Sequence, residues 1–241
     1  ILNEIVPINI NNGQWTNYHG IRCKFLYEAS EFNHVLYEQI KNFKGGANNK
    51  SKSFNLFSLI EKIKPNTIIE MGCNNGLYTF GCAKHCPTIG IDYDINAIND
   101  ANNLNKKFKT QSTFLCFNLL DEKRIDVEFG INGAYGNIYS RLKSELLIAP
   151  AIIHHLFNQS KSTDKIIDIF SKFAEKYMII EQIPDTVNEA NLRLSLKKYN
   201  WDVINELESS PNPRKWLLCK KMELLLYHHG AGDGEDKASQ D

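Results

Sequence analysis

The chain has 241 residues, its 28 basic and 28 acidic side chains cancel to a formal net charge of zero, and 42% of its residues are hydrophobic. These values predict one α/β domain with a sizeable core, and they argue against a disordered polyelectrolyte and against a nucleic-acid partner. No apolar run approaches the roughly 20 residues of a membrane span, and the first residues show no signal-peptide pattern. We therefore expect a cytoplasmic protein without a membrane span.

The composition divides the chain into three regions. Residues 1–50 are rich in aromatic and large apolar side chains and end in a Gly-Gly-Ala-Asn-Asn hinge, which predicts an N-terminal helical cap or lid. Residues 51–221 carry the alternating pattern of the main domain. Residues 222–241 form a tail, and its last part, 230–241, is small, polar and acidic, which predicts that the tail is disordered at its end.

Within the main domain, strand and helix patterns alternate. We expect helices over 53–63, 77–85, 94–108 and 163–177, the first of them capped by Ser53, and strands over 67–69, 88–91, 113–117, 146–149, 177–180, 201–207 and 215–220. Strands separated by helices form parallel βαβ units. The last two strands are joined too closely for a parallel crossover, so they should pair antiparallel at one edge. The pattern predicts a mostly parallel seven-stranded sheet with an antiparallel C-terminal edge strand.

The sharpest motif is Glu70-Met71-Gly72-Cys73-Asn74-Asn75-Gly76, where an apolar strand leads into a tight turn and then a helix. Glycine suits such a turn because it accepts a positive φ and lets a ligand approach the backbone. Asp92 follows Gly72 by 20 residues and ends the next strand. A carboxylate there can accept two hydrogen bonds from a ribose diol. Together these features predict an adenosine-containing cofactor.

The charge of the turn discriminates between cofactors. Asn74 stands where the dinucleotide fingerprint has its second glycine, which a pyrophosphate needs for close approach. Glu70 adds negative charge beside any phosphate, whereas it suits the amino group and sulfonium of S-adenosylmethionine. The residues favour S-adenosylmethionine over a dinucleotide.

The Glu70–Gly76 turn resembles the first motif of the class I S-adenosylmethionine-dependent methyltransferases. Gly90-Ile91-Asp92 is similar to their second motif, and Glu145–Leu156, which ends in His-His-Leu, is similar to the motif of their fourth strand. The resemblance implies a Rossmann-like three-layer sandwich and S-adenosylmethionine as cofactor. It implies cofactor contacts from Glu70, Gly72, Asn74, Gly76, Asp92, Tyr93, Asn118, Leu119 and Ala149.

A narrower resemblance is to a bacterial subgroup that carries Gln-Trp-Thr-Asn-Tyr near its start, as residues 14–18 do here, and His-His-Leu after strand four. Some members methylate sugars or capping groups of surface polysaccharides. This resemblance implies O-methylation of a small molecule or glycan hydroxyl. Pro150 and the Gly-rich loop 122–143 depart from the subgroup's pattern.

An alcohol acceptor must lose its proton, and a histidine near neutral pKa can take it. His154 and His155 are the candidates, although one of them can instead simply pack at a helix start. Glu181 at the end of strand five is a candidate second base, or a ligand of a metal or of sugar hydroxyls. Its alternative is a carboxylate satisfied by neighbouring backbone.

The remaining candidates each have a plain structural alternative. Trp15 and Tyr18 could form an aromatic lid over the acceptor, or simply pack. Arg141 and Arg214 could bind an anionic acceptor, or be solvated at the surface. Lys50, Lys52, Lys62 and Lys64 fit a solvated helix face better than a nucleic-acid stripe. Cys82, His85 and Cys86 lack a fourth metal ligand at structural spacing, so we predict no metal.

Three other functions stay open at this point. An NAD-type oxidoreductase uses a similar sheet, but the missing second glycine and Glu70 argue against it. A non-catalytic cofactor-binding or scaffold domain would keep the fold without turnover. An RNA methyltransferase of the amino-methylating kind is disfavoured because Ala149-Pro150-Ala151-Ile152 stands where its N/D-P-P-Y/F motif would be.

Overall fold

The computed structural model of the chain describes residues 23–43, 51–121, 138–209 and 213–223. Three features of the sequence therefore lie outside the described residues. These are the aromatic pair Trp15 and Tyr18, most of the Gly-rich loop 122–143, and the tail from residue 224 onward.

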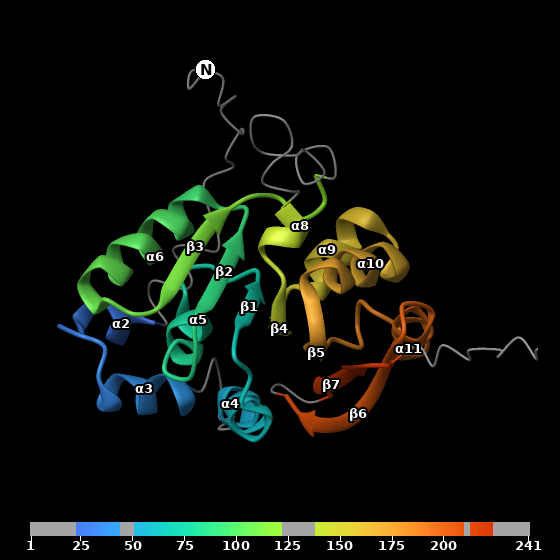
Figure 1. Cartoon of the computed structure of the whole chain (residues 1–241), viewed down its shortest axis with the longest axis horizontal. Helices are drawn as coiled ribbons and strands as arrows, with labels where there is room; N and C mark the ends of the chain where they lie inside the picture. The colour runs from blue at the N-terminus through green and yellow to red at the C-terminus, as the bar shows by residue number, and fades with distance from the viewer. Residues whose placement is uncertain (1–22, 44–50, 122–137, 210–212, 224–241) are drawn as a thin grey trace, which may run out of the picture.

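The centre of the fold is a seven-stranded sheet, as predicted. Its strands are β1 (Ile68–Met71), β2 (Thr88–Asp92), β3 (Ser112–Cys116), β4 (Ser144–Ala149), β5 (Ala174–Gln182), β6 (Trp201–Glu208) and β7 (Lys215–Lys221). Figure 1 shows them in the spatial order β3-β2-β1-β4-β5-β7-β6. The first five strands run parallel to one another, and β7 runs antiparallel to both β5 and β6. The expected antiparallel pairing of the last two strands is thus confirmed. Strand β7 lies between β5 and β6, so β6 is the edge strand.

Helices cover both faces of the sheet, which completes the predicted three layers. One face packs against α4 (Ser51–Ile63), α5 (Leu77–Cys82) and α6 (Ile95–Phe108), joined by α2 (Lys24–Glu28) and α3 (His34–Lys41). The other face packs against α8 (Ile138–Arg141), α9 (Ile153–Ser160), α10 (Thr163–Phe173) and α11 (Glu189–Lys198). Apolar side chains at helical spacing explain this placement, as in α10, where Ile166, Ile167, Phe170 and Phe173 are fully buried.

Several element boundaries differ from the prediction. The helix predicted to reach Tyr177 ends at Phe173, because Ala174 is already extended and pairs with Ser144 of β4. The first main-domain helix begins at Ser51, so Ser53 is not its cap. The Ser53 hydroxyl instead donates to the carbonyl of Phe43 at 3.0 Å. The helix predicted over 77–85 ends at Cys82.

Helices α9 and α11 were not predicted. The signal for α11 was present in the sequence, because Asn188 caps the helix and Leu192 and Leu196 recur four residues apart as buried side chains. In α9 the two histidines interrupt the apolar pattern. They were interpreted as part of the His-His-Leu motif, so no helix was predicted there.

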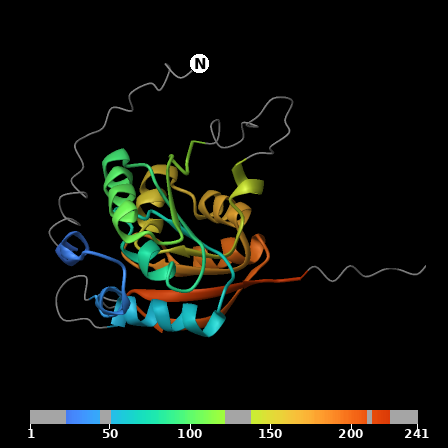
Figure 2. The same ribbon diagram turned by 60° about the vertical axis from the view of Figure 1, so that its left-hand side comes forward.

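The first described helices share the core of the main domain. Leu26 of α2 and Leu36 and Ile40 of α3 are buried in the same cluster as Phe57 of α4. Helix α3, blue in Figure 2, lies next to helix α4, which is cyan, and the two helices are in contact. The hydroxyl of Tyr37 in α3 donates to Glu61 of α4 at 2.8 Å.

Candidate functional site

The strand order of the sheet reverses between β1 and β4, because the chain moves outward from β1 to β3 and then returns to β4 on the other side. Ligands of open α/β sheets bind at the carboxyl ends of the strands at such a switch point. A pocket of about 160 Å³ opens there. It is lined by Gly72, Ile91, Asp92, Tyr93, Phe117, Asn118, Leu119, Ile152, His155, Leu156 and Gln159.

The turn after β1 has the backbone that the glycines predicted. Gly72 and Gly76 have φ angles of 75° and 87°, and Asn74 between them has 48°. Glycine is also needed for packing, since a Cβ at Gly72 would lie 2.8 Å from Ile152, and one at Gly76 would lie 2.7 Å from the Phe114 ring. The turn is therefore fixed against α9 on one side and against β3 on the other.

Asp92 reaches the pocket from the end of β2 and is held by backbone amides. Its two carboxylate oxygens accept hydrogen bonds from the N–H groups of Asn74 at 2.8 Å and Asp94 at 3.0 Å. Burial raises the pKa of this carboxyl above its usual range. An ionised carboxylate has about four acceptor positions, so two remain after the backbone amides. Asp92 can thus accept two hydroxyl donors, as the sequence predicted for a ribose diol.

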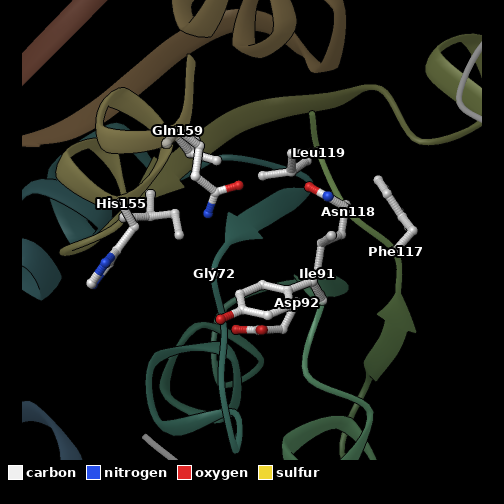
Figure 3. A pocket seen from close by; sticks show the side chains of 11 residues that line it. Gly72, Ile91, Asp92, Phe117, Asn118, Leu119, His155 and Gln159 are labelled. Carbon is white, nitrogen blue, oxygen red and sulfur yellow. The ribbon is translucent and has the colours of Figure 1, made fainter. Parts of the chain in front are cut away.

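One side of the pocket is mainly apolar. Figure 3 shows Phe117, Asn118 and Leu119 along this side, and His155 and Gln159 on the opposite side. Tyr93 adds a second aromatic ring to the lining. Apolar side chains can pack against the faces of a nucleobase, and the Asn118 amide on the same side can hydrogen-bond to its edge. This side of the pocket therefore suits a nucleobase.

Sequence reasoning missed the contribution of α9 to this pocket. Ile152, His155, Leu156 and Gln159 all line it. Their spacing of three and four residues places them on one face of a helix. The signal was available in the sequence, but the predicted elements contained no helix there. Ile91 and Phe117 were missed as well, although each is adjacent to a predicted site residue.

The other predicted cofactor residues do not line the pocket. Glu70 is buried, with 1% of its surface exposed, and accepts a hydrogen bond from the Thr79 hydroxyl of α5. Burial raises the pKa of Glu70 to about 8. Asn74 and Gly76 belong to the turn after β1, where the N–H of Asn74 donates to Asp92, and Ala149 is fully buried in β4.

The two histidines lie side by side on α9, with ring centroids 3.9 Å apart. His155 lines the pocket, and burial lowers the pKa of its ring. His154 has a buried Nδ1 without a hydrogen-bond partner in the described part of the chain. Burial, His155 and the Arg214 guanidinium lower the pKa of His154 to about 4. Both rings are therefore neutral near pH 7 and able to accept a proton, and His154 is the weaker base.

Next to His154 lies a group of charged residues that we call the Glu181 cluster, consisting of Lys52, Glu181 and Arg214. Glu181 is fully buried and accepts hydrogen bonds from Lys52 Nζ, the N–H of Ala151 and the hydroxyl of Ser209, each at 2.7 Å. Arg214 Nη1 lies 3.8 Å from Glu181 Oε1. These contacts agree with the alternative reading of Glu181 as a satisfied carboxylate, and its role as a base stays a prediction.

Two basic residues differ from their expected surroundings. The prediction that Lys52 lies on a solvated helix face is wrong. Only 13% of its side chain is exposed, because Lys52 at the start of α4 pairs with the buried Glu181 of β5. Arg141, by contrast, is exposed at the end of α8 and does not line the pocket.

The remaining sequence candidates can be placed in the described ranges. Cys82 and Cys86 are buried, and His85 Nε2 lies 3.0 Å from the Tyr37 hydroxyl. Within those ranges no group of three His, Cys, Asp or Glu side chains could hold a metal ion. Likewise, none of the described helices combines the length and the apolar character needed to cross a bilayer.

No protein-family model and no curated protein sequence matches this chain. Solved structures do resemble it. Magnesium protoporphyrin IX methyltransferase (ChlM) from Synechocystis PCC 6803, solved with bound S-adenosylmethionine, has a TM-score of 0.56 at 14% identity, over 86% of this chain and 95% of that one.

Two further neighbours belong to the same class of enzyme. A TehB-like S-adenosylmethionine-dependent methyltransferase from Corynebacterium glutamicum has a TM-score of 0.55 at 11% identity, over 86% of this chain and 98% of that one. The N-methyltransferase NodS from Bradyrhizobium japonicum WM9 has a TM-score of 0.51 at 13% identity, over 70% and 96%. The chain thus has the Rossmann-like α/β fold of class I S-adenosylmethionine-dependent methyltransferases.

Proposed function

We propose that this protein is an S-adenosylmethionine-dependent methyltransferase. The observation that carries the proposal is that one pocket is lined both by the Asp92 carboxylate and by the apolar side chains of Phe117 and Leu119. This combination fits the ribose and the adenine of the cofactor. The structural neighbour ChlM, which was solved with this cofactor bound, supports the proposal.

The pocket suits a dinucleotide less well. Among the described residues that line it there is no Lys or Arg to meet a pyrophosphate, and Asp92 adds negative charge. At the turn, Asn74 occupies the position of the second glycine of the dinucleotide fingerprint. These features favour a cationic cofactor over an NAD-type one.

We assign the role of general base to His155. The bound cofactor would supply a methyl group on a sulfonium. The acceptor oxygen would form a bond to the methyl carbon as the bond from sulfur to that carbon breaks, and the neutral thioether would leave. His155 lines the pocket and would take the proton of an acceptor hydroxyl. His154 is less suited, because its pKa of about 4 makes it a weak base.

The acceptor we propose is a hydroxyl of a small molecule or glycan. Orienting it toward the methyl group can contribute roughly 7–11 kcal/mol to lowering the barrier. Glu181 supports this arrangement as a positioning residue, because it holds the N–H of Ala151 directly before α9 and its two histidines. A non-catalytic cofactor-binding domain would bind the same ligand without turnover.

The test is calorimetry of the full chain with S-adenosylmethionine, S-adenosylhomocysteine and NAD. We expect the first two to bind and NAD not to bind. Asp92→Ala should weaken S-adenosylhomocysteine binding at least tenfold, about 1.4 kcal/mol, because two hydrogen bonds to a charged acceptor are lost. His155→Asn should weaken this affinity much less than Asp92→Ala does, but abolish most turnover once an acceptor is found in a screen.

Asp202→Ala is the matched control, since Asp202 is an exposed carboxylate on β6, remote from the pocket. Thermal unfolding of Asp92→Ala must show a folded protein, because Asp92 also holds two backbone amides. Binding of NAD alone, or equal losses in Asp92→Ala and Asp202→Ala, would overturn the proposal. Binding without turnover over a broad acceptor screen would favour the scaffold alternative.

A further inference from the structure

The Glu181 cluster has more positive than negative charge. It contains two cations, Lys52 and Arg214, against the single carboxylate of Glu181. Lys52 is the direct partner, because its Nζ donates to Glu181 Oε2 at 2.7 Å. Ser209 and the N–H of Ala151 fill further acceptor positions of the same carboxylate. Glu181 therefore neutralises Lys52 and has little capacity left for a second cation.

Arg214 is the residue left with unused donors. Its guanidinium lies 3.8 Å from Glu181, beyond hydrogen-bond distance, and 28% of its side chain is exposed. A guanidinium has five N–H donors in a planar fork that fits a carboxylate or phosphate bidentately. In the described part of the chain, Glu181 is the only carboxylate within ion-pair distance of it. A half-enclosed cation with free donors favours an anionic ligand.

The position of Arg214 relates this free cation to the candidate catalytic residues. Glu181, 3.8 Å from the Arg214 guanidinium, accepts a hydrogen bond from the N–H of Ala151, three residues before His154. The nearby positive charge of Arg214 helps to lower the pKa of His154. The His154 ring lies 3.9 Å, centroid to centroid, from the ring of His155, which lines the pocket. A molecule bound at Arg214 would lie against the histidines, where the acceptor must be.

We propose that Arg214 binds an oxyanion of the methyl acceptor, a carboxylate or a phosphate monoester, beside the histidine pair. This inference rests on the proposed methyltransferase function and specifies the class of its acceptor. A neutral acceptor would leave the guanidinium without a bidentate partner. A small molecule or sugar that carries a carboxylate or a phosphate satisfies both Arg214 and the requirement for a reactive oxygen near His155.

The experiment is titration of the full chain with two probes, inorganic phosphate and acetate, by calorimetry. Each titration is done with and without saturating S-adenosylhomocysteine, so that anion binding is measured even if the cofactor product does not bind. We expect Arg214→Ala to weaken binding of the preferred anion at least tenfold. Arg214→Lys keeps the charge but loses the fork, and it should give a smaller loss. A preference for phosphate or for acetate identifies the class of oxyanion.

Lys220→Ala is the matched control, because Lys220 is an exposed cation on the same strand β7. It should bind the anions like the unaltered protein, and all three variants should bind S-adenosylhomocysteine equally well. The inference is wrong if neither anion binds, if Arg214→Ala binds as the unaltered protein does, or if Lys220→Ala shows the same loss. Failure of S-adenosylhomocysteine to bind overturns the proposed function instead. Thermal unfolding establishes that each variant is folded, and Arg214→Lys serves if Arg214→Ala is not.

Discussion

Three buried or half-buried carboxyl groups lie toward the carboxyl ends of β1, β2 and β5, and their surroundings differ. Asp92 is held by two backbone amides and keeps acceptor positions for a ligand. Glu181 is neutralised by Lys52 and does not line the pocket. Glu70 lies behind the turn with the Thr79 hydroxyl as its hydrogen-bond donor, and burial raises its pKa to about 8. Depending on its partners, a carboxyl group in this fold therefore keeps acceptor positions open, anchors the start of a helix, or has a raised pKa.

The raised pKa of Glu70 predicts a pH dependence of stability in the cofactor-free protein. Between its ordinary pKa of 4.5 and the folded value of about 8, the folded chain binds a proton at Glu70 that the unfolded chain has released. The free energy of unfolding should therefore fall as the pH rises through this window, by up to about 1.4 kcal/mol per pH unit. In Glu70→Gln this contribution is absent.

Urea unfolding at several values between pH 5 and pH 8 measures this slope. The difference in unfolding free energy between the unaltered protein and Glu70→Gln should change steadily with pH over that range. Glu175→Gln removes an exposed carboxyl and controls for the loss of one negative charge. A difference that stays constant from pH 5 to pH 8 would show that Glu70 is ionised throughout.

At the residue scale, the sequence predicted the residues whose positions depend on a short continuous segment of the chain. Gly72 and Asp92 lie in short segments whose spacing reflects a strand, a turn and the next strand. The pairing of Lys52 with Glu181 joins residues 129 positions apart, and nothing in either local segment indicates the other. For this reason the sequence placed Lys52 on a solvated helix face. It named Arg214 as a candidate for binding an anionic acceptor but could not show that Arg214 lies near Glu181.

At the scale of elements, the start of α4 is fixed to the carboxyl end of the sheet. Lys52 contributes twice, because its Nζ pairs with Glu181 of β5 and its carbonyl accepts from the Trp216 indole of β7 at 3.1 Å. Glu181 also accepts from the N–H of Ala151, which precedes α9. One buried carboxylate thus connects α4, β5 and the helix that carries both histidines.

This connection predicts a large cost for removing the carboxylate alone. Glu181→Ala leaves Lys52 without its counter-ion in a site where only 13% of the lysine side chain is exposed. Breaking such a pair from one side costs about 3–5 kcal/mol of unfolding free energy. The double variant Lys52→Met with Glu181→Leu should recover much of that loss, because no uncompensated charge remains at this pair.

Urea unfolding of Lys52→Met, Glu181→Leu and the double variant that combines them gives the coupling energy directly. The matched control is Lys24 and Glu28, an exposed pair at 3.0 Å in α2 whose side chains are 76% and 60% exposed. Glu28→Ala should cost no more than about 0.5 kcal/mol. Strictly additive single changes at Lys52 and Glu181 would show that the two groups do not stabilise each other.

Element prediction failed where periodicity was broken or a boundary depended on pairing. In α9 the two histidines interrupt the apolar pattern, although Ile153 and Leu156 are buried. The end of α10 is set by the pairing of Ala174 with Ser144, a contact between distant segments. In contrast, the parallel order of strands followed from the alternation of elements alone, because crossover geometry leaves few arrangements.

At the scale of the whole molecule, the question is whether α2 and α3 form a separate cap. The sequence predicts a unit over residues 1–50 that is distinct from the main domain. In the described part of that unit, Leu26, Leu36 and Ile40 are buried in the same cluster as α4, α5 and α6. The packing is close, because a Cβ on Gly81 of α5 would lie 2.9 Å from Ile40 Cγ2. This shared core predicts one cooperative unit that includes α3.

Ile40→Ala tests this cooperativity, with Val35→Ala as the matched control on the same helix. Ile40 is fully buried, whereas Val35 is 66% exposed. Ile40→Ala should lower the unfolding free energy by about 2–5 kcal/mol, and Val35→Ala should change it by less than about 0.5 kcal/mol. In native-state hydrogen exchange, the slowest amides of α3, β1 and β4 should lose protection by the same amount in Ile40→Ala, because they open together. Loss of protection confined to α3, with β1 and β4 unchanged, would show that α3 is a lid that opens independently of the sheet.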